Sequence, residues 1–249
     1  MSRKLFMPHL IVRKNEIHST NSFATELMKS NNPSAGTVVL ALNQTKGRGQ
    51  HTNVWESEWG KNLTISIILM PDFLPIDQQF KISMIISLGV LDYLKIYLPN
   101  VFIKWPNDIY VQDDKIAGIL IEHSVMGATL SQSICGIGLN INQEKFYSDA
   151  PNPTSLKLQT NKDYEIELEL SKLLESIEAR YFQLLDGKLN LLEENYLQSL
   201  YWINELHQFE DKNGSFTGEI TGVTAWGQLR IFVGEQERIY NFKEVSFIS

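Results

Sequence analysis

Residues 45–62, with the sequence TKGRGQHTNVWESEWGKN, separate two apolar runs that have the composition of β-strands. The run before this segment is Thr37–Leu42 (TVVLAL), and the run after it is Leu63–Met70 (LTISIILM). Runs of this length that are rich in β-branched residues and bounded by glycine and polar residues predict strands, here buried ones. The segment between them is therefore predicted to be a long polar loop that joins two buried strands.

The first part of this loop has the composition of a site for an anionic group next to a ring. Gly47 and Gly49 flank Arg48, and glycine lets backbone N–H groups approach a ligand closely. The guanidinium can grip a carboxylate or phosphate through two hydrogen bonds, and the indole of Trp55 can cover a flat ring. Taken alone, a GRG run is more typical of an ordinary surface hairpin loop, so its interpretation depends on the rest of the chain.

The composition is that of a globular protein with a sizeable core. The chain has 249 residues, 43% hydrophobic and 20% charged, which suits one large domain or one domain with a small module. The apolar runs are too short to cross a bilayer, and the first 20 residues lack the apolar segment of a secretion signal. The single cysteine, Cys135, excludes an intramolecular disulfide and is predicted to be a buried structural thiol. We therefore expect a cytoplasmic protein without membrane association, and the net charge of −7 argues against broad nucleic-acid binding.

The patterns along the chain predict a mixed sheet with helices, followed by a β-rich tail. Further strands are expected at 9–17, 101–105, 109–111, 115–122 and 130–141, and their succession as hairpins indicates an antiparallel or mixed sheet. Helices are expected at 23–29, 78–98, 165–185 and 189–203. Short strand-like runs follow from residue 206, so we assign residues 1–205 to a main domain and 206–249 to a small barrel.

Three more clusters combine polar residues with predicted element ends. Residues 19–21 (STN) precede the first helix, where capping by Ser19 is the simpler interpretation, although helix N-termini also bind polar groups. Residues 104–108 (KWPND) run from a strand into a turn that presents an amide and a carboxylate, and such a carboxylate can hold Mg²⁺ or a ribose hydroxyl. Lys115 begins an apolar strand and could act as a point charge on developing negative charge. The alternative for residues 104–108 is an ordinary turn, and the alternative for Lys115 is a solvated strand end.

Taken together and in this order, these clusters resemble the biotin protein ligase family, in a short form without an N-terminal DNA-binding domain. KWPND at 104–108 and KIAGILIE at 115–122 are the most specific matches, accompanied by STN at 19–21, GRG at 47–49 and GIGLN at 136–140. The similarity extends from about residue 15 to 145, and the tail resembles the family's C-terminal domain. It implies an α+β fold with a catalytic domain related to class II aminoacyl-tRNA synthetases, in which a mixed, largely antiparallel sheet packs with helices. It also implies a small C-terminal SH3-like β-barrel.

The resemblance implies an ATP-dependent ligase that uses Mg²⁺. In that reaction the carboxylate of biotin attacks the α-phosphate of ATP and forms biotinyl-5′-AMP and pyrophosphate. A lysine of a biotin carboxyl carrier domain, from acetyl-CoA carboxylase or a related carboxylase, then takes the acyl group and releases AMP. Because two anions must meet, cations and N–H donors should provide the largest catalytic contribution.

The resemblance also implies the site residues. The catalytic cations would be Arg48 and Lys115, and the candidate ligand of Mg²⁺ is Asp108. The residues implied for biotin are Ser19, Thr20, Asn21, Gln44, Gly47, Arg48, Gly49, Gln50, Lys115 and Gly118. The residues implied for ATP or the adenylate are Arg48, Trp55, Lys104, Asn107, Asp108, Lys115 and Asn140.

The chain departs from the family pattern in two places. After GRG it continues with QHTNV at 50–54, where many members are more basic, which predicts weaker retention of the adenylate. Fewer than 20 residues precede Ser19, so neither a helix-turn-helix repressor domain nor DNA binding is expected. The 45–55 segment is expected to become ordered when ligand binds. Exposed strands would allow edge pairing with the carrier or with a second copy as a homodimer.

Two alternatives share the predicted fold. A ligase for another acyl cofactor such as lipoate would use the same chemistry, but the chain lacks an RRxSGGG run and contains the KWPND block, which that family lacks. A non-catalytic biotin sensor would keep the pocket without turnover, and the presence of both Arg48 and Lys115 argues against it.

Overall fold

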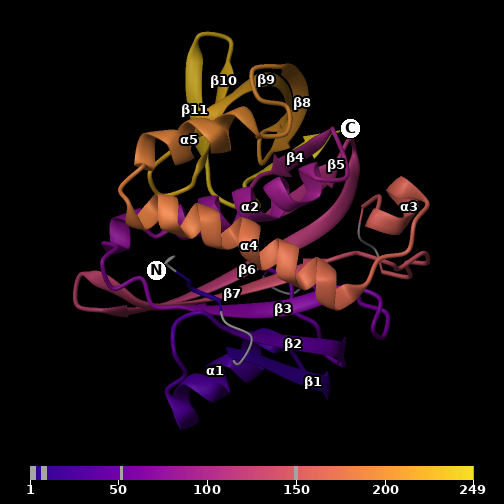
Figure 1. Ribbon diagram of the computed structural model, residues 1–249. Coiled ribbons are helices and arrows are strands. Elements are labelled where there is room, and N and C mark those ends of the chain that lie inside the picture. The colour runs from indigo at the N-terminus through magenta and orange to yellow at the C-terminus, as the bar shows by residue number, and fades with distance from the viewer. Residues whose placement is uncertain (1–3, 7–9, 51–52, 149–150, 249) are drawn as a thin grey trace.

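The computed structural model describes residues 4–6, 10–50, 53–148 and 151–248, which form two β-sheets and their helices (Figure 1). The larger sheet contains β1 (Ile11–Ile17), β2 (Thr37–Gln44), β3 (Leu63–Leu69), β4 (Val101–Lys104), β5 (Asp108–Val111), β6 (Asp114–Met126) and β7 (Thr129–Leu139). The helices are α1 (Thr20–Asn31), the 3-10 helix η2 (Ile76–Gln78), α2 (Phe80–Lys95), α3 (Leu156–Thr160), α4 (Ile166–Leu185) and α5 (Leu189–Gln198). The C-terminal sheet contains β8 (Leu206–Asp211), β9 (Gly214–Val223), β10 (Leu229–Val233), β11 (Gln236–Tyr240) and β12 (Val245–Ile248). The predicted α+β class is confirmed.

The larger sheet is mixed but mainly antiparallel, as predicted. Its strand order is β1-β2-β3-β7-β6-β5-β4, in which the β1–β2 pair is parallel and the other neighbouring pairs are antiparallel. Strands β2 and β3 pair with Thr37 opposite Ile68 and Ala41 opposite Thr64. The 45–62 segment is therefore a long hairpin connection between two neighbouring strands.

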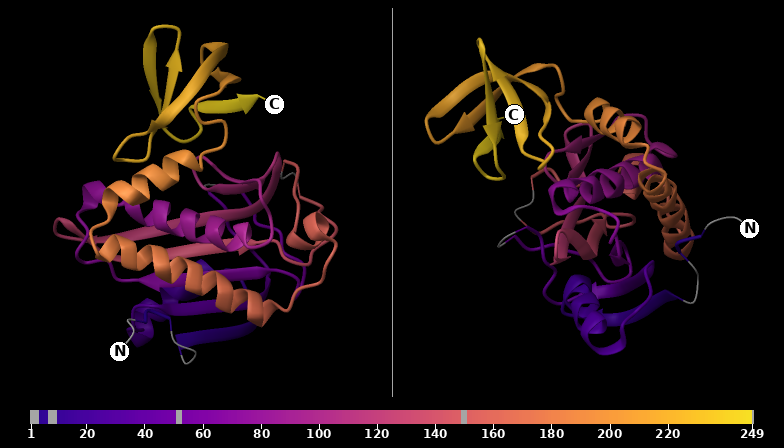
Figure 2. Two further views of the ribbon diagram at one scale, coloured as in Figure 1. Left: turned by 45° about the horizontal axis from the view of Figure 1, so that its top comes forward. Right: turned by 90° about the vertical axis from the view of Figure 1, so that its left-hand side faces the viewer.

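Side-chain alternation divides the buried residues between the two faces of this sheet. Val38 and Leu40 join the main hydrophobic core with residues of α2 and α4, whereas Val39 joins a smaller core with residues of α1. Figure 2 shows α2 and α4 on one face of the sheet and α1 on the other. All seven residues of β3 are buried, and each isoleucine such as Ile67 contributes about 1.5–3 kcal/mol through burial. Cys135 is also buried, as predicted, and burial raises the pKa of its thiol.

Helix α2 is apolar around most of its circumference because it is enclosed between the sheet and α4. Gly89 allows the close approach of α4, since a Cβ at this position would lie 2.7 Å from the Cα of Ile177. The carboxylate of Glu169 on α4 is buried, and it accepts a hydrogen bond of 2.7 Å from the hydroxyl of Tyr93 on α2. Within the described ranges, the helices are all too short or too polar to span a membrane.

The predicted end of the last helix is wrong, for a tertiary reason. Helix α5 ends at Gln198 and does not continue to residue 203, because the chain beyond it pairs with the edge strand β4. The backbone of Ile103 donates to the carbonyl of Ser199 at 2.8 Å and accepts from the N–H of Tyr201 at 2.9 Å. The sequence patterns also do not predict α3 and β12, which have five and four residues.

The C-terminal sheet is antiparallel, and it is not closed into the small barrel that the sequence predicts. Its order is β11-β10-β9-β8-β12, and within residues 206–248 no strand pairing joins the edge strands β11 and β12. Side chains of β11 instead reach β8 and β9: the Tyr240 hydroxyl donates to Asp211 at 2.9 Å, and the Tyr240 ring stacks on Phe216. Strand β8 begins beside the predicted division between residues 1–205 and 206–249, and that division stays a prediction.

Trp105, in the turn after β4, connects the two sheets. Its indole Nε1 donates a 2.7 Å hydrogen bond to the carbonyl of Gly227, and its ring meets that of Phe242 at a centroid distance of 6.4 Å. Gly227 has a φ of +83°, and a Cβ there would lie 2.2 Å from the Phe80 ring. The KWPND run therefore also anchors the C-terminal sheet.

Replacing Trp105 with phenylalanine should weaken this anchor. The change removes the indole donor and leaves the buried carbonyl of Gly227 without its hydrogen bond, which should lower the free energy of unfolding by about 1–3 kcal/mol. Urea denaturation followed by circular dichroism would measure the loss. The matched control is Trp226→Phe, because Trp226 is 54% exposed and should tolerate the change within about 0.5 kcal/mol. Equal stability of the two variants would contradict the anchoring role.

Candidate functional site

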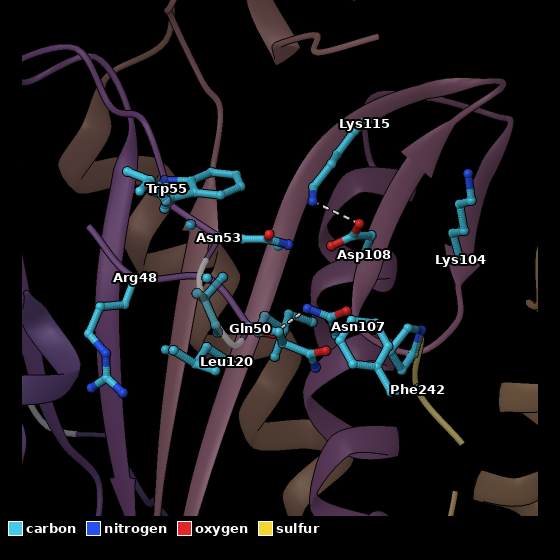
Figure 3. A pocket seen from close by; sticks show the side chains of 18 of the residues that line it. Arg48, Gln50, Asn53, Trp55, Lys104, Asn107, Asp108, Lys115, Leu120 and Phe242 are labelled. Carbon is cyan, nitrogen blue, oxygen red and sulfur yellow. Dashed lines mark hydrogen bonds and ion pairs between the residues drawn. The ribbon is translucent and has the colours of Figure 1, made fainter. Parts of the chain in front are cut away.

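A cleft of about 570 Å³ lies between the 45–62 loop, strands β6 and β7, the β4–β5 turn and the last residues of the chain (Figure 3). Most of the residues that sequence reasoning selected line it. They are Ser19, Thr20, Asn21, Gln44, Arg48, Gly49, Gln50, Trp55, Lys104, Asn107, Asp108, Lys115 and Gly118. Gly47 and Asn140 are the two selected residues that do not line it. The structure thus brings together selected residues that are up to about a hundred positions apart in the chain.

One end of the cleft is formed by the N-terminus of α1, and its capping differs from the prediction. Ser19 occupies the N-cap position, but its side chain makes no capping hydrogen bond. Gln44 of β2 provides the acceptor instead: its Oε1 accepts from the backbone N–H of Thr20 at 2.6 Å and from the Thr20 hydroxyl at 3.2 Å. A side chain from the neighbouring strand therefore caps the helix. Ser19 is 4% exposed and lines the wall of the cleft. Its hydroxyl is not used to cap the helix.

Arg48 and Asn21 are both bound to one carboxylate, that of Glu122 on β6. The Arg48 guanidinium donates to the two oxygens of Glu122 at 2.8 and 3.3 Å, and Nδ2 of Asn21 donates to Glu122 Oε2 at 2.8 Å. Figure 3 shows the Arg48 guanidinium pointing away from Lys115 and Asp108. The two predicted catalytic cations are therefore on different sides of the cleft in this conformation.

The floor of the cleft is a pair of glycines on which the Trp55 indole lies. Gly118 of β6 and Gly138 of β7 are opposite each other in the sheet. A Cβ would lie 3.0 Å from the indole at Gly118 and 2.2 Å from it at Gly138. A Cβ at Gly138 would therefore overlap the ring, whereas one at Gly118 would be in tight contact with it. The Trp55 Nε1 is buried and has no hydrogen-bond partner among the described residues.

The opposite end of the cleft carries two lysines and one carboxylate. The Lys115 ammonium pairs with Asp108 at 2.7 Å, and their side chains are 18% and 23% exposed. Burial raises the pKa of Asp108, and the attraction of Lys115 opposes this shift. Burial also lowers the pKa of Lys104, and the charge of Asp108 opposes that shift. With two cations and one anion, this end suits a polyanionic group such as a phosphate chain.

Asp108 fits Mg²⁺ as a single carboxylate ligand. Among the described residues, no group of three or more histidine, cysteine, aspartate or glutamate side chains could hold a metal ion. Mg²⁺ is commonly held by one or two carboxylates together with substrate phosphates and water, and one carboxylate is what this site offers. Its role as a magnesium ligand stays a prediction.

The remaining selected residues support the cleft from behind or join its walls. Asn140 is buried, and its Nδ2 donates to the carbonyl of Thr154 at 2.9 Å. Gly47 is required by the loop itself, because a Cβ there would lie 2.2 Å from the carbonyl oxygen of Trp55. Asn107 donates to the carbonyl of Ile119 at 2.7 Å, which fixes the turn after Trp105. The predicted loop residue His51 lies outside the described residues.

Sequence reasoning missed three aromatic residues that line the cleft, namely Tyr110, Phe242 and Phe247. Tyr110 could have been found, because it is two residues after Asp108 in a strand and therefore faces the same side. Phe242 and Phe247 carry no local signal, since they reach the cleft only through the docking of the C-terminal sheet.

Residues 15–140 match the biotin/lipoate A/B protein ligase family. The bifunctional ligase/repressor BirA of Bacillus spizizenii is 30% identical over 243 residues, which cover 94% of this chain and 72% of that protein. The biotin–[acetyl-CoA-carboxylase] ligase of Mycobacterium tuberculosis is 32% identical over 152 residues, which cover 59% of this chain and 55% of that protein. A solved structure of the biotin protein ligase from Aquifex aeolicus, in complex with biotin and ATP, is similar with a TM-score of 0.78 and 26% identity. The similarity covers 95% of this chain and 97% of the Aquifex aeolicus chain.

A Gly138→Ala substitution should displace the Trp55 indole from the floor of the cleft. The new methyl group would overlap the ring, so the free energy of unfolding should fall by about 1–3 kcal/mol. In a Trp55→Ala background the same substitution should be nearly neutral, because the obstructing ring is gone. Urea unfolding of the two single variants and the double variant gives the coupling energy of this cycle. Additive effects would contradict the packing of Trp55 on Gly138.

Proposed function

Because the chain belongs to the biotin/lipoate A/B protein ligase family, we propose that it is a biotin protein ligase that activates biotin with ATP and transfers it to a carrier protein. The observation that carries this proposal is the division of one cleft into a neutral polar end and a cationic end. Biotin has a neutral ring system with polar ureido atoms and an anionic carboxylate at the end of an apolar chain. These two ends match the two ends of the cleft.

The neutral end of the cleft suits the ureido group. Ser19 and Thr20 bring hydroxyl groups, Gln44 brings an amide, and none of them carries a charge. Such a site can supply placed hydrogen bonds to a neutral ligand without the free-energy cost of burying an ion. We assign these side chains to biotin, with the Trp55 indole, which covers the glycine floor in this conformation, as an apolar wall.

The cationic end suits the reacting groups. The carboxylate of biotin attacks the α-phosphorus of ATP, a new O–P bond forms, and the bond to pyrophosphate breaks. Lys115 would stabilise the charge that accumulates on the phosphate, and Lys104 would bind along the phosphate chain. Arg48 can join them only after leaving Glu122, which is a change of partner for a side chain that is 47% exposed.

Magnesium enters this scheme with its nucleotide, as MgATP. Asp108 would hold it or a ribose hydroxyl, and Asn107 would order the same turn. Trp55 would have to leave the glycine floor on which it lies in order to cover the adenylate and shield the mixed anhydride from water. The role of Asn140 is then to support the nucleotide end indirectly, through the segment that it ties to Thr154.

The second step is the transfer of biotin to an amine. Biotin protein ligases act on biotin carboxyl carrier proteins of carboxylases. The neutral amine of the carrier lysine attacks the acyl carbon, the amide bond forms as the bond to AMP breaks, and the proton leaves to solvent. We propose a carrier domain of acetyl-CoA carboxylase or a related carboxylase as the acceptor, which the name of the Mycobacterium tuberculosis relative supports.

ATP–pyrophosphate exchange tests this function directly. The purified protein with MgATP should exchange labelled pyrophosphate into ATP when biotin is present and remain at background with lipoate or octanoate. A reaction without acid is the control. Exchange with lipoate or octanoate instead would change the substrate while keeping the chemistry. No exchange with any acid, together with tight binding of biotin, would favour a non-catalytic sensor.

Lys115→Ala should reduce the exchange rate by about 10²–10³-fold, because it removes a cation aimed at the developing phosphate charge. Biotin binding, measured by calorimetry, should persist. Lys46→Ala is the control for loss of a lysine, since Lys46 is exposed in the loop after β2 and does not line the cleft. Lys115→Ala also leaves Asp108 without its ion-pair partner. The stability of this variant is therefore measured by urea unfolding as well. A normal exchange rate in a folded Lys115→Ala protein would rule out the assigned role.

A further inference from the structure

Lys104 is held by three aromatic rings that come from separate parts of the chain. Its ammonium lies 4.5 Å from the ring centroid of Tyr110, 5.2 Å from that of Phe247 and 5.6 Å from that of Tyr201. Tyr110 belongs to β5, Tyr201 follows α5, and Phe247 belongs to β12 of the C-terminal sheet. An ammonium within about 6 Å of an aromatic ring centroid is attracted by the ring quadrupole, and more strongly where water is excluded. We call these three residues the aromatic cage.

The aromatic cage holds the ammonium without neutralising it. Among the described residues, no carboxylate lies within 4.0 Å of the Lys104 ammonium, and the nearby Asp108 is paired with Lys115. Lys104 donates instead to the Tyr110 hydroxyl at 3.3 Å. Lys104, Tyr110 and Phe247 all line the cleft, so the charge remains available to an anion that enters it.

The position of Phe247 is fixed by the C-terminal sheet. Phe247 is opposite Phe209 in the β8–β12 pair, and the two rings meet edge to face at a centroid distance of 5.3 Å. Phe209 is 0% exposed, so it is a rigid support. The ring of Trp202, in the segment that enters this sheet, lies 5.4 Å from that of Phe247 on another side. Phe247 can therefore reach Lys104 only when the C-terminal sheet is folded and docked.

The other two rings are held by the main sheet. Tyr110 and Tyr201 contact each other at a centroid distance of 5.5 Å, and the Tyr201 hydroxyl donates to Asp113 at 2.5 Å. Two rings of the aromatic cage therefore come from residues outside the C-terminal sheet, and Phe247 completes it.

We propose that Phe247 is a positioning residue for the adenylation step, because it completes the aromatic cage that aims the Lys104 ammonium at the phosphates of MgATP. This inference rests on the proposed function and gives the C-terminal sheet a part in nucleotide binding. A carboxylate in place of the ring would also hold the lysine, but it would cancel the charge that the phosphates need. An aromatic ring restricts the ammonium and leaves its charge intact.

Phe247→Leu is the decisive variant, because leucine keeps the apolar packing but has no ring quadrupole. In pyrophosphate exchange we expect kcat/KM for MgATP to fall by about 5- to 30-fold, while the Kd for biotin stays within twofold. Phe247→Tyr keeps a ring and should remain within threefold of the unchanged protein. Phe232→Leu, an exposed phenylalanine on β10 of the same sheet, is the matched control and should have no effect.

A double-mutant cycle separates positioning from a general structural effect. In a Lys104→Met background, Phe247→Leu should lower kcat/KM for MgATP by less than twofold further, because its target is gone. An equal loss in both backgrounds, or a parallel loss of biotin affinity, would overturn the proposal. Normal MgATP kinetics in Phe247→Leu would overturn it while leaving the ligase function intact. Failure of the unchanged protein to exchange with any acid would remove the ligase function and this positioning role together.

Discussion

The burial of β3 on both faces is the constraint on which the geometry of the cleft depends. Because α1 covers one face and the α2–α4 layer covers the other, a slip of one residue in β3 would move every side chain to the opposite core. The register of β3 with β7 places Thr64 opposite Gly138 and Ser66 opposite Gly136. The same alternation puts Gly118 and Glu122 of β6 on the α1 face. The loop that follows β2 therefore closes over a floor whose composition is determined by strand register.

Three of the cations that line the cleft are held in different ways. Arg48 is bound to Glu122 in a partly exposed pair, and such pairs contribute only about 0–1 kcal/mol, so a ligand carboxylate or phosphate can replace Glu122. Lys115 is bound to Asp108 in a more buried pair, which orients it more firmly. Lys104 is held by rings and keeps its charge uncompensated. This gradation places a partly exposed arginine beside the neutral end of the cleft and two more buried lysines at its opposite end.

The KWPND run serves structure and chemistry at once. Lys104, Trp105 and Asp108 all line the cleft, and the Trp105 indole also donates to the carbonyl of Gly227. One short turn therefore positions two charged side chains and attaches the C-terminal sheet. Phe242 and Phe247 from the C-terminal part of the chain also line the cleft. The cleft is therefore formed by both the main sheet and the C-terminal sheet.

Local composition and spacing were enough to predict the kinds of residue in the site, the strands around the 45–62 loop and the family resemblance. Which partner each polar group takes depends on contacts between segments that are remote in the chain. Gln44 caps α1 in place of Ser19, Glu122 binds Arg48, and α5 stops where its chain meets β4, and in each case the partner is distant in sequence. The open edge of the C-terminal sheet and the contact of Phe247 with Lys104 also depend on segments that are distant in sequence. Periodicity predicts which face of an element is buried, but the competition among hydrogen-bond and packing partners is settled only when remote segments come together.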